Sequence, residues 1–215
     1  MTFRGWPAEA LEFYEGLEAD NSKTYWQENK AVYEDQVLAP MQALLDELEP
    51  EFGAGKIFRP YRDVRFSKDK TPYKTAMGAS LAEGGYVHLD SGGLGVGSGM
   101  YHMAADQLER YRRAVDDETT GTEVTALVEA ASKTGMDVSA HDVLKLAPKG
   151  YPKDHPRIDL LRQKGLITWQ QWPAGRWLGT PKAKDRVVNL LRASGPIMAW
   201  LHKNVGPSDL PDQRR

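Results

Sequence analysis

The spacing of hydrophobic residues predicts two helices in the first quarter of the chain. Pro7 suits the first turn of the first helix. The hydrophobic residues of that helix are Leu11, Phe13, Tyr14 and Leu17. Those of a longer second helix are Trp26, Tyr33, Val37, Met41, Leu44, Leu45 and Leu48. Residues 20–22 (DNS) offer cap oxygens for the second helix, and Pro40 predicts a kink or break in it near Leu38.

The pattern changes to a period of two after Lys56, which predicts a strand over residues 56–66. One face of this strand would carry Ile57, Arg59, Tyr61, Asp63 and Arg65. The opposite face would carry Phe58, Pro60, Arg62, Val64 and Phe66. Because Pro60 removes a donor from the hydrogen-bond ladder, we expect this strand at the edge of a sheet.

Alternating strand and helix patterns continue along the rest of the chain. The expected strands are residues 76–81, 86–89, 93–101, 143–146 and 166–172. The expected helices are residues 106–115, 123–133, 158–164 and 180–193, and residues 197–203 after a break at Gly195 and Pro196. The prediction is an α+β fold: a single domain over residues 1–207, with a mostly antiparallel central sheet and helices from both chain ends packed on it. Residues 208–215 are expected to be a frayed tail.

Composition excludes several kinds of site. The chain has no cysteine, which excludes disulfides, thiolate metal sites and a cysteine nucleophile. It has no run of about 18 apolar residues, so no membrane segment is expected. The first 20 residues lack the pattern of a secretory signal, and together these features predict a cytoplasmic protein. The oligomeric state is not indicated.

Positive charge is concentrated in residues 59–75, RPYRDVRFSKDKTPYKT. This stretch holds six basic and two acidic side chains, although the whole chain has a formal net charge of −2. Residues 149–215 form a second basic block, with 13 basic and 5 acidic side chains. Either these blocks pair with acidic surfaces when the chain folds, or they surround an anionic ligand.

The predicted strand sorts the charged residues of this stretch into two sets. On one face, a carboxylate at Asp63 can hold the neighbouring arginines rigid while their other N–H groups bind an anion. The predicted ligand-binding residues are Arg59, Arg65, Lys68, Lys70 and Tyr73. On the other face, a charge among hydrophobic neighbours must be paired. The residues assigned to structural ion pairs are Arg62, Asp63 and Asp69.

Two other interpretations of the basic stretch stay open. It could be a purely structural salt-bridge network that protects an edge strand from unwanted pairing. It could also bind nucleic acid or an acidic protein, since basic and aromatic residues alternate there. The overall pI of about 6.2 argues against a nucleic-acid-binding domain.

Two further motifs have both a structural and a functional interpretation. The glycines at alternate positions of residues 93–99 leave one strand face bare, either for an aromatic ring or helix to pack on or as the floor of a ligand site. In PKGYPKDHP, residues 148–156, Asp154 could orient His155 for acid–base chemistry. Either residue could instead cap the helix that begins near Pro156.

No cofactor motif is present in the sequence. The dinucleotide pattern G-x-G-x-x-G, the zinc pattern H-E-x-x-H and the nucleophile pattern G-x-S-x-G are all missing. The five histidines are scattered, so no metal site is predicted and any cofactor is unknown. His88 shares a strand face with Tyr86, which could bring it to the cationic cluster.

The charged motif resembles a known family signature. R-x-x-R-D-x-R-F, beginning at Arg59, is followed by D-K-x-x-Y, which ends at Tyr73. With DNSKTYWQENKAVYE, GGLGVGSGMY and PKGYPKDHP, in the expected order over about residues 3–175, it is similar to the bacterial family catalogued as domain of unknown function 2461, also found in fungal proteins. The family usually has two asparagines before the tryptophan of the second helix, and Asp20 replaces the first.

The resemblance implies one domain of about this length and brings no substrate, cofactor or catalytic residue. Its marked positions are Arg59, Arg62, Asp63, Arg65, Asp69, Lys70 and Tyr73. The leading hypothesis is therefore a small anionic, phosphorylated ligand bound at residues 59–74, with the question of an enzymatic reaction left open. If a reaction takes place, the candidate proton carriers are Asp63, Tyr73 and His155.

Overall fold

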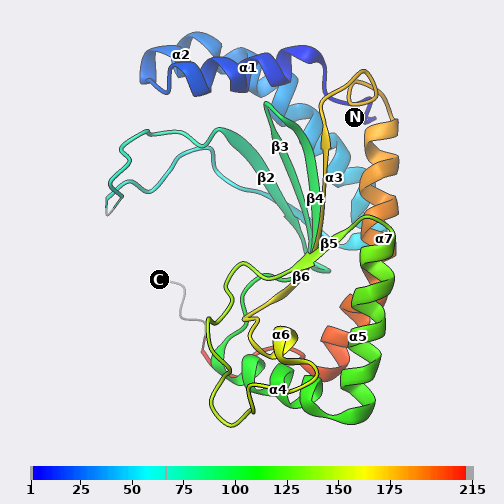
Figure 1. The fold of residues 1–215 in the computed structure, drawn as a ribbon. Coiled ribbons are helices and arrows are strands. Elements are labelled where there is room, and N and C mark those ends of the chain that lie inside the picture. The colour runs from blue at the N-terminus through cyan, green and yellow to red at the C-terminus, as the bar shows by residue number, and fades with distance from the viewer. Residues whose placement is uncertain (1, 66, 212–215) are drawn as a thin grey trace. The chain divides into compact units, whose positions relative to one another are not determined.

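The first two helices form where the hydrophobic pattern predicts them. The computed structural model describes residues 2–65 and 67–211 (Figure 1). Helix α1 (Ala8–Ala19) buries Phe13, Tyr14 and Leu17. Helix α2 (Lys23–Val32) begins after Ser22, whose hydroxyl accepts a hydrogen bond of 3.1 Å from the backbone N–H of Tyr25. That bond satisfies one of the N–H groups that a helix start leaves without a partner.

The irregularity expected near Leu38 is a π-helical segment. Segment η1 (Tyr33–Leu38) follows α2 directly and leads into helix α3 (Ala39–Phe52) without a gap. Pro40 lies in the first turn of α3, directly after this segment, and a proline removes one bond from the helical ladder, a usual cause of such an irregularity. Gly53 ends α3 with a φ of 76°, a conformation that suits glycine.

The strands form one antiparallel sheet, which confirms the predicted α+β class and single domain. Its strand order is β1-β2-β3-β4-β6-β5. The strands are β1 (Gly55–Ile57), β2 (Ala76–Leu81), β3 (Gly85–Asp90), β4 (Gly93–Met100), β5 (Asp137–Ser139) and β6 (Leu166–Pro173). In the β2–β3 hairpin, Gly78 lies opposite His88 and Ala79 lies opposite Val87.

The strand predicted over residues 56–66 is wrong beyond Ile57. Residues 58–75 form a long loop that extends from the sheet (Figure 1), so their side chains do not divide into two strand faces. The two arms of the loop are joined near its base, where the Arg62 N–H donates to the Pro72 carbonyl at 2.9 Å and the Lys74 N–H donates to the Pro60 carbonyl at 2.8 Å. Charged residues in both alternating sets left neither face able to pack on a core. Phe66 lies outside the described residues.

Further helices follow β4 along the chain. They are α4 (Ala105–Asp116), α5 (Glu118–Lys133), α6 (Ile158–Leu161) and α7 (Lys182–Asn204). The strand predicted over residues 143–146 is wrong, because β5 forms earlier in the chain and Val143 makes only an isolated bridge to Gln163. Val143 and Leu146 are 47% and 73% exposed, so these residues have no core on which a strand could pack.

Helix α7 runs without the break predicted at Gly195 and Pro196. Buried residues lie on both sides of this pair; within α7 they are Ala183, Val187, Leu190, Leu191, Ser194, Ile197, Met198, Trp200 and Leu201. Gly195 and Pro196 lie on the exposed side, where water can satisfy the carbonyl that Pro196 leaves without a donor. Continuous burial therefore outweighs the local cost of one proline, about 3 kcal/mol.

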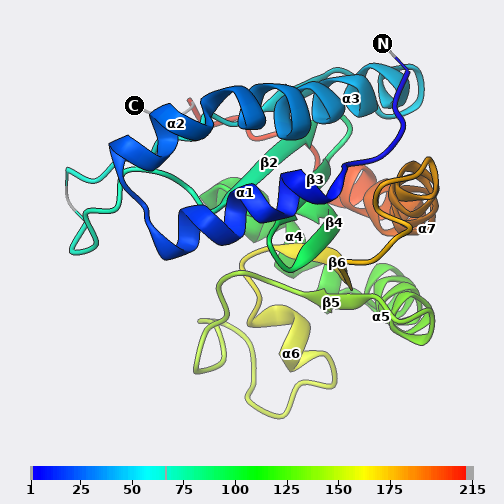
Figure 2. The same cartoon turned by 90° about the horizontal axis from the view of Figure 1, so that it is seen from above.

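Contacts between residues divide the chain into two compact units. The first comprises Met1–Val96 and Gln171–Leu190. In it, α3 packs on β1 and β2, and α1 and α2 lie across one end of β2 and β3 (Figures 1 and 2). Its largest fully buried side chains include Trp6, Tyr14, Leu44 and Leu48. This unit contains the whole 58–75 loop.

The second unit comprises Gly97–Gln170 and Leu191–Arg215. Tyr111 and Trp200 are fully buried in it, with their rings edge to face at 6.1 Å. The ring of Trp169 lies so close to Gly97 that an added Cβ would be 2.9 Å from it. An aromatic ring therefore covers part of the bare glycine face, which is the structural interpretation of that motif.

The predicted boundary at residue 207 stays a prediction. Just beyond it, the Ser208 hydroxyl donates to Asp106 Oδ1 at 2.7 Å, and the Asp209 N–H donates to Oδ2 of the same residue at 2.8 Å. The last part of the predicted tail, residues 212–215, lies outside the described residues.

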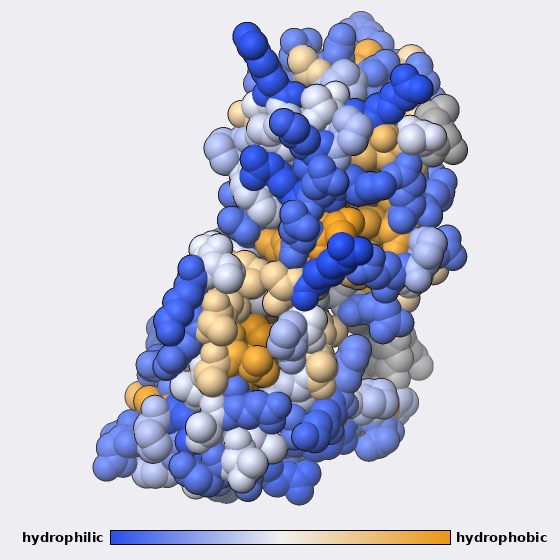
Figure 3. Space-filling view, turned by 90° about the vertical axis from the view of Figure 1, so that its right-hand side faces the viewer, coloured by the Kyte–Doolittle hydropathy of each residue, from blue (hydrophilic) through white to orange (hydrophobic). Residues whose placement is uncertain are grey.

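Hydrophilic residues cover most of the face shown in Figure 3, with hydrophobic side chains visible in separate patches. Within residues 2–65 and 67–211, no helix combines the length and apolar character needed to cross a membrane.

Candidate functional site

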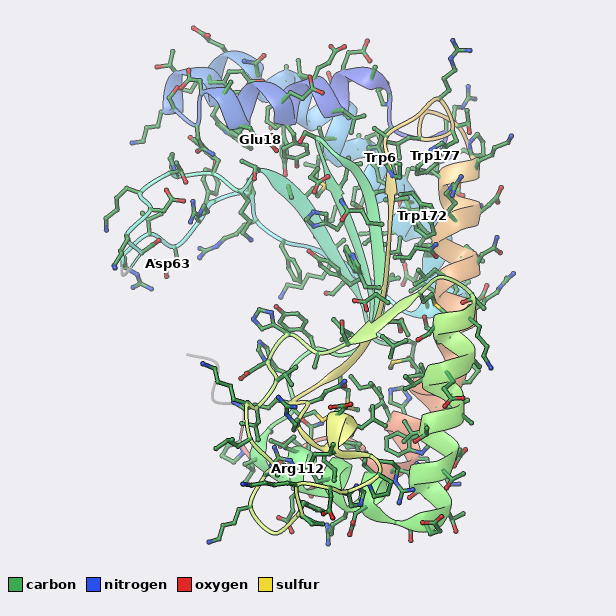
Figure 4. All side chains as sticks on the ribbon, viewed as in Figure 1. Trp6, Glu18, Asp63, Arg112, Trp172 and Trp177 are labelled. Carbon is green, nitrogen blue, oxygen red and sulfur yellow. The ribbon has the colours of Figure 1, made fainter. Side chains whose placement is uncertain are left out.

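A cleft in the first unit lies where the base of the 58–75 loop meets β2, β3 and the end of α1. Its volume is about 600 Å³, within the range typical of small-molecule sites. Its lining residues are Glu18, Asn21, Phe58, Arg62, Asp69, Thr71, Tyr73, Lys74, Thr75, Ala76, Gly78, Tyr86 and His88. Figure 4 shows Glu18 on the side of α1 that faces β2 and β3. Most of the lining side chains are polar, and two of them, Arg62 and Lys74, are basic.

Arg62 is fixed in the cleft by the loop itself. Its Nη1 donates both to a carboxylate oxygen of Asp69 and to the hydroxyl of Thr71. The Asp69 carboxylate also accepts the backbone N–H of Thr71 at 3.0 Å and its hydroxyl at 2.9 Å. Both bonds of Arg62 use one nitrogen, so its Nε and Nη2 have no protein partner within the part of the chain that the structure describes.

This pairing predicts an acid-labile loop. Arg62 and the two groups of Thr71 hold the pKa of Asp69 at about 2, below the usual 3.8. Because the folded pKa is the lower one, ionised Asp69 favours the folded loop above about pH 4. That contribution is lost as the pH falls toward 2. A ¹³C NMR titration should give Asp69 a midpoint near 2, and Arg62→Gln should return it toward 3.8. An unchanged midpoint in Arg62→Gln would disprove the assigned cause.

Lys74 is the second cation of the cleft. It is partly buried, and its Nζ lies 5.8 Å from the centre of the Phe58 ring. Burial and the charge of Arg59 lower the pKa of Lys74. Among the described residues, no carboxylate pairs with this ammonium group. A partly desolvated cation without a counter-ion is a site where an anion is favoured.

Asn21 ties the start of α2 to the wall of the cleft. Its Oδ1 accepts the backbone N–H of Tyr73 at 3.0 Å, and its Nδ2 donates to the Tyr73 carbonyl at 3.1 Å. Behind this contact, the Tyr73 ring stacks on Trp26 at 4.4 Å with only 6° between the planes. The wall beside Lys74 is therefore held by two hydrogen bonds and a stacked aromatic pair.

Two polar side chains of β3, Tyr86 and His88, also line the cleft. Tyr86, His88 and Asp90 alternate with buried residues, so all three lie on one face of the strand. The Tyr86 hydroxyl is 3.3 Å from His88 Nδ1, and His88 Nε2 is 3.0 Å from an oxygen of Asp90. His88 and Arg62 both line this cleft.

Four of the five predicted ligand-binding residues are not among the residues that line the cleft; they are Arg59, Arg65, Lys68 and Lys70. Arg65 instead makes two bonds to Asp63, of 2.9 and 2.7 Å, and Asp63 lies toward the far end of the loop (Figure 4). Lys70 donates to the Val64 carbonyl at 2.9 Å. Tyr73 is the predicted ligand residue that does line the cleft.

His155, a candidate proton carrier, lies in the second unit and is not part of the cleft. Its Nδ1 accepts the backbone N–H of Arg157 at 3.0 Å, and its Nε2 lies 3.1 Å from Asp116. Asp116, not the neighbouring Asp154, therefore orients the imidazole. Both ring nitrogens are engaged just before α6, an arrangement that serves the local structure.

Sequence reasoning missed several lining residues, for an identifiable reason. Glu18, Asn21 and Thr71 come from the end of α1, the turn before α2 and the loop, and only the fold brings them together. Asn21 did have a local signal, but as a helix cap, a role that Ser22 takes. Across residues 2–65 and 67–211 the structure contains no group of three or more histidine or acidic side chains placed to hold a metal ion.

Fold and site together define a single α+β domain with a polar cleft lined by two basic side chains, Arg62 and Lys74. The particular family follows from comparison with known proteins. A family model described as "Conserved hypothetical protein (DUF2461)" matches residues 9–200, so the chain belongs to this family, as its charged motif predicted. Comparison with curated proteins and with solved structures gave no match.

Proposed function

We propose that the cleft binds a small anionic, phosphorylated ligand, with Arg62 and Lys74 as the groups that hold the phosphate. The observation that carries this proposal is Lys74, a partly buried ammonium group with no carboxylate partner among the described residues. An isolated charge in such a place is costly, and a bound anion removes that cost.

Arg62 supports the proposal through the geometry of its hydrogen bonds. Asp69 and Thr71 occupy Nη1 and fix the guanidinium plane. Nε and Nη2 lie on one edge of that plane and can donate a parallel pair of bonds to two phosphate oxygens. Asp69 thus plays the orienting part first expected of Asp63.

Glu18 suggests what else the ligand carries. Its carboxylate lines the same cleft and accepts the Ser91 hydroxyl at 2.8 Å. A carboxylate repels phosphate but accepts hydrogen bonds from hydroxyl groups. A phosphate monoester with free hydroxyl groups, such as a small sugar or polyol phosphate, would suit both the two basic side chains and the Glu18 carboxylate.

Isothermal titration calorimetry with inorganic phosphate and with glycerol 3-phosphate tests the proposal. Lys74→Met should weaken the binding of both by about 10-fold or more, because a hydrogen bond to a charged group contributes roughly 1.5–3 kcal/mol. The matched control is Lys68→Met, which removes an equal charge from an exposed position of the same loop that does not line the cleft.

The two lysine variants separate the proposal from its alternatives. Equal weakening by both variants would indicate non-specific attraction to a basic loop. No binding to the wild-type protein would leave the structural salt-bridge network as the better explanation of the motif. Salt-sensitive binding of a mixed oligonucleotide pool without binding of phosphate would favour a nucleic-acid surface.

A further inference from the structure

Three side chains of β3 form an ordered hydrogen-bond chain that ends in the cleft. Asp90 Oδ1 accepts the backbone N–H of Gly93 at 3.0 Å, which fixes the carboxylate at the β3–β4 turn. Its Oδ2 lies 3.0 Å from His88 Nε2, and His88 Nδ1 lies 3.3 Å from the Tyr86 hydroxyl. The side chains of His88 and Asp90 are only 24% and 26% exposed, so water competes weakly for these bonds.

The direction of the chain follows from Asp90. An ionised carboxylate only accepts hydrogen bonds, so the proton between the two groups belongs to His88 Nε2. The other nitrogen of a neutral imidazole, Nδ1, is then an acceptor for the Tyr86 hydroxyl. A nucleophile, a base within reach of it and a third group that orients the base form the arrangement expected of an activated nucleophile. Catalytic hydrogen bonds are often somewhat long before a ligand binds.

Neighbouring residues fix the Tyr86 ring in this position. Gly78 lies opposite His88 on β2, and a Cβ added there would be 2.5 Å from the Tyr86 hydroxyl oxygen. Glycine at this position therefore provides the space that the hydroxyl occupies. On its other side, the Tyr86 ring stacks on Phe58 at 6.1 Å, and the Lys74 ammonium group lies over the same Phe58 ring. One aromatic side chain thus contacts both the phenol and a proposed phosphate-binding cation.

We infer that the Tyr86 hydroxyl is a nucleophile for phosphoryl transfer, with His88 as its base and Asp90 as the group that positions His88. The choice of phosphorus as the electrophile rests on the proposed function. Tyr86 oxygen forms a bond to phosphorus while the bond from phosphorus to the ester oxygen breaks. His88 takes the phenolic proton and delivers it to the leaving oxygen. Arg62 and Lys74 lie in the same cleft to stabilise the charge on the phosphoryl oxygens.

Hydrolysis would complete the reaction. Water attacks phosphorus and gives one proton to His88 as the bond from phosphorus to Tyr86 oxygen breaks. The phenolate then regains that proton from His88, and hydrogen phosphate leaves. The two steps together consume one phosphate monoester and one water molecule. Phosphate monoesters, the ligands proposed above, are therefore the proposed substrates.

Reaction with diisopropyl fluorophosphate tests the nucleophile without knowledge of the substrate. The Tyr86 oxygen would form a bond to phosphorus, the phosphorus–fluorine bond would break, and fluoride would leave while His88 takes the proton. Peptide mass spectrometry should show Tyr86 labelled about 100-fold faster than Tyr61 and Tyr101, which are 50% and 48% exposed in the same chain. Equal rates at the three tyrosines would overturn the inference.

Variants distinguish an activated phenol from one that is merely accessible. His88→Ala should slow labelling of Tyr86 by at least about 10-fold, and added imidazole should restore part of the rate. Asp90→Asn and Gly78→Ala should slow it too, the second by displacing the hydroxyl, with circular dichroism confirming that each variant is folded. Labelling as fast in folded His88→Ala as in the wild type would contradict the inference.

The same experiments keep this inference separate from the proposed function. Binding of phosphate that depends on Lys74, together with an unreactive Tyr86, would leave the ligand site and remove only the nucleophile. A reactive Tyr86 without phosphate binding would remove the ligand site and leave an activated phenol whose electrophile is not a phosphate. Release of p-nitrophenol from p-nitrophenyl phosphate by the wild type and its loss in Tyr86→Phe would support both.

Discussion

Replacing Trp26 by alanine should lower the free energy of unfolding by about 3–5 kcal/mol, the range for a large aromatic residue removed from a core. Trp26 is 5% exposed and lies in a cluster with Phe13, Tyr33 and Tyr73, with the Tyr33 ring centre at 4.8 Å and the Tyr73 ring stacked at 4.4 Å. The cluster joins α1, α2 and η1 to the base of the 58–75 loop. Its loss should therefore open the cleft as well as destabilise the fold.

Urea unfolding followed by circular dichroism measures this effect. Tyr61→Ala is the control, because Tyr61 contacts the same Trp26 ring at 6.0 Å but is half exposed, and it should cost about 1 kcal/mol or less. If Trp26→Ala cost no more than the control, the aromatic cluster would not be what holds the loop to the helices.

Replacing Asn21 by aspartate should damage both stability and ligand binding. The change removes the donor to the Tyr73 carbonyl and puts a negative charge beside that oxygen. Loss of this part-buried hydrogen bond, with its partner left unsatisfied, should cost about 1 kcal/mol. The new carboxylate also lines the cleft near Lys74, so phosphate affinity should fall by about 10- to 100-fold.

Asn29→Asp is the matched control for Asn21→Asp. Asn29 also donates from its side-chain amide to a backbone carbonyl, that of Tyr25 at 2.9 Å, but it does not line the cleft. Calorimetric titration should show near wild-type phosphate affinity for Asn29→Asp. Similar phosphate affinity in the two variants would mean that Asn21 has no part in the site.

Local patterns along the chain were sufficient to predict the class of fold. Helix α4 and strands β2, β4 and β6 lie within one residue of their predicted bounds. The spacing of hydrophobic residues in these elements is regular because one face of each is buried. The family was also predictable, since a long motif of fixed spacing does not depend on how the chain folds.

The errors arose where local preference and tertiary packing disagree. Residues 58–66 alternate like a strand but have no neighbouring strand over most of their length, so they form a loop. Gly195 and Pro196 normally end a helix, but buried residues on both sides of them hold α7 together. In both places the deciding information lies in distant segments, which sequence alone does not place.

The same limitation shifted the candidate site within residues 59–74. A strand would have put Arg59 and Arg65 on a ligand-binding face and Arg62 against the core. Because the segment is a loop whose base pairs with residues 72–74, Arg62 and Lys74 line the cleft instead. His88 and Tyr86 were correctly placed on one face of their strand, where the alternation of β3 is regular.

An NMR titration of the ¹⁵N-labelled protein with inorganic phosphate tests the phosphate site most directly. The amide signals of Lys74, Thr75 and His88 should shift together and reach saturation with one affinity. In Lys74→Met, the same shifts should need about 10-fold more phosphate. Shifts confined to Arg59, Arg65 and Lys68, or shifts that grow linearly without saturation, would contradict a phosphate site in the cleft.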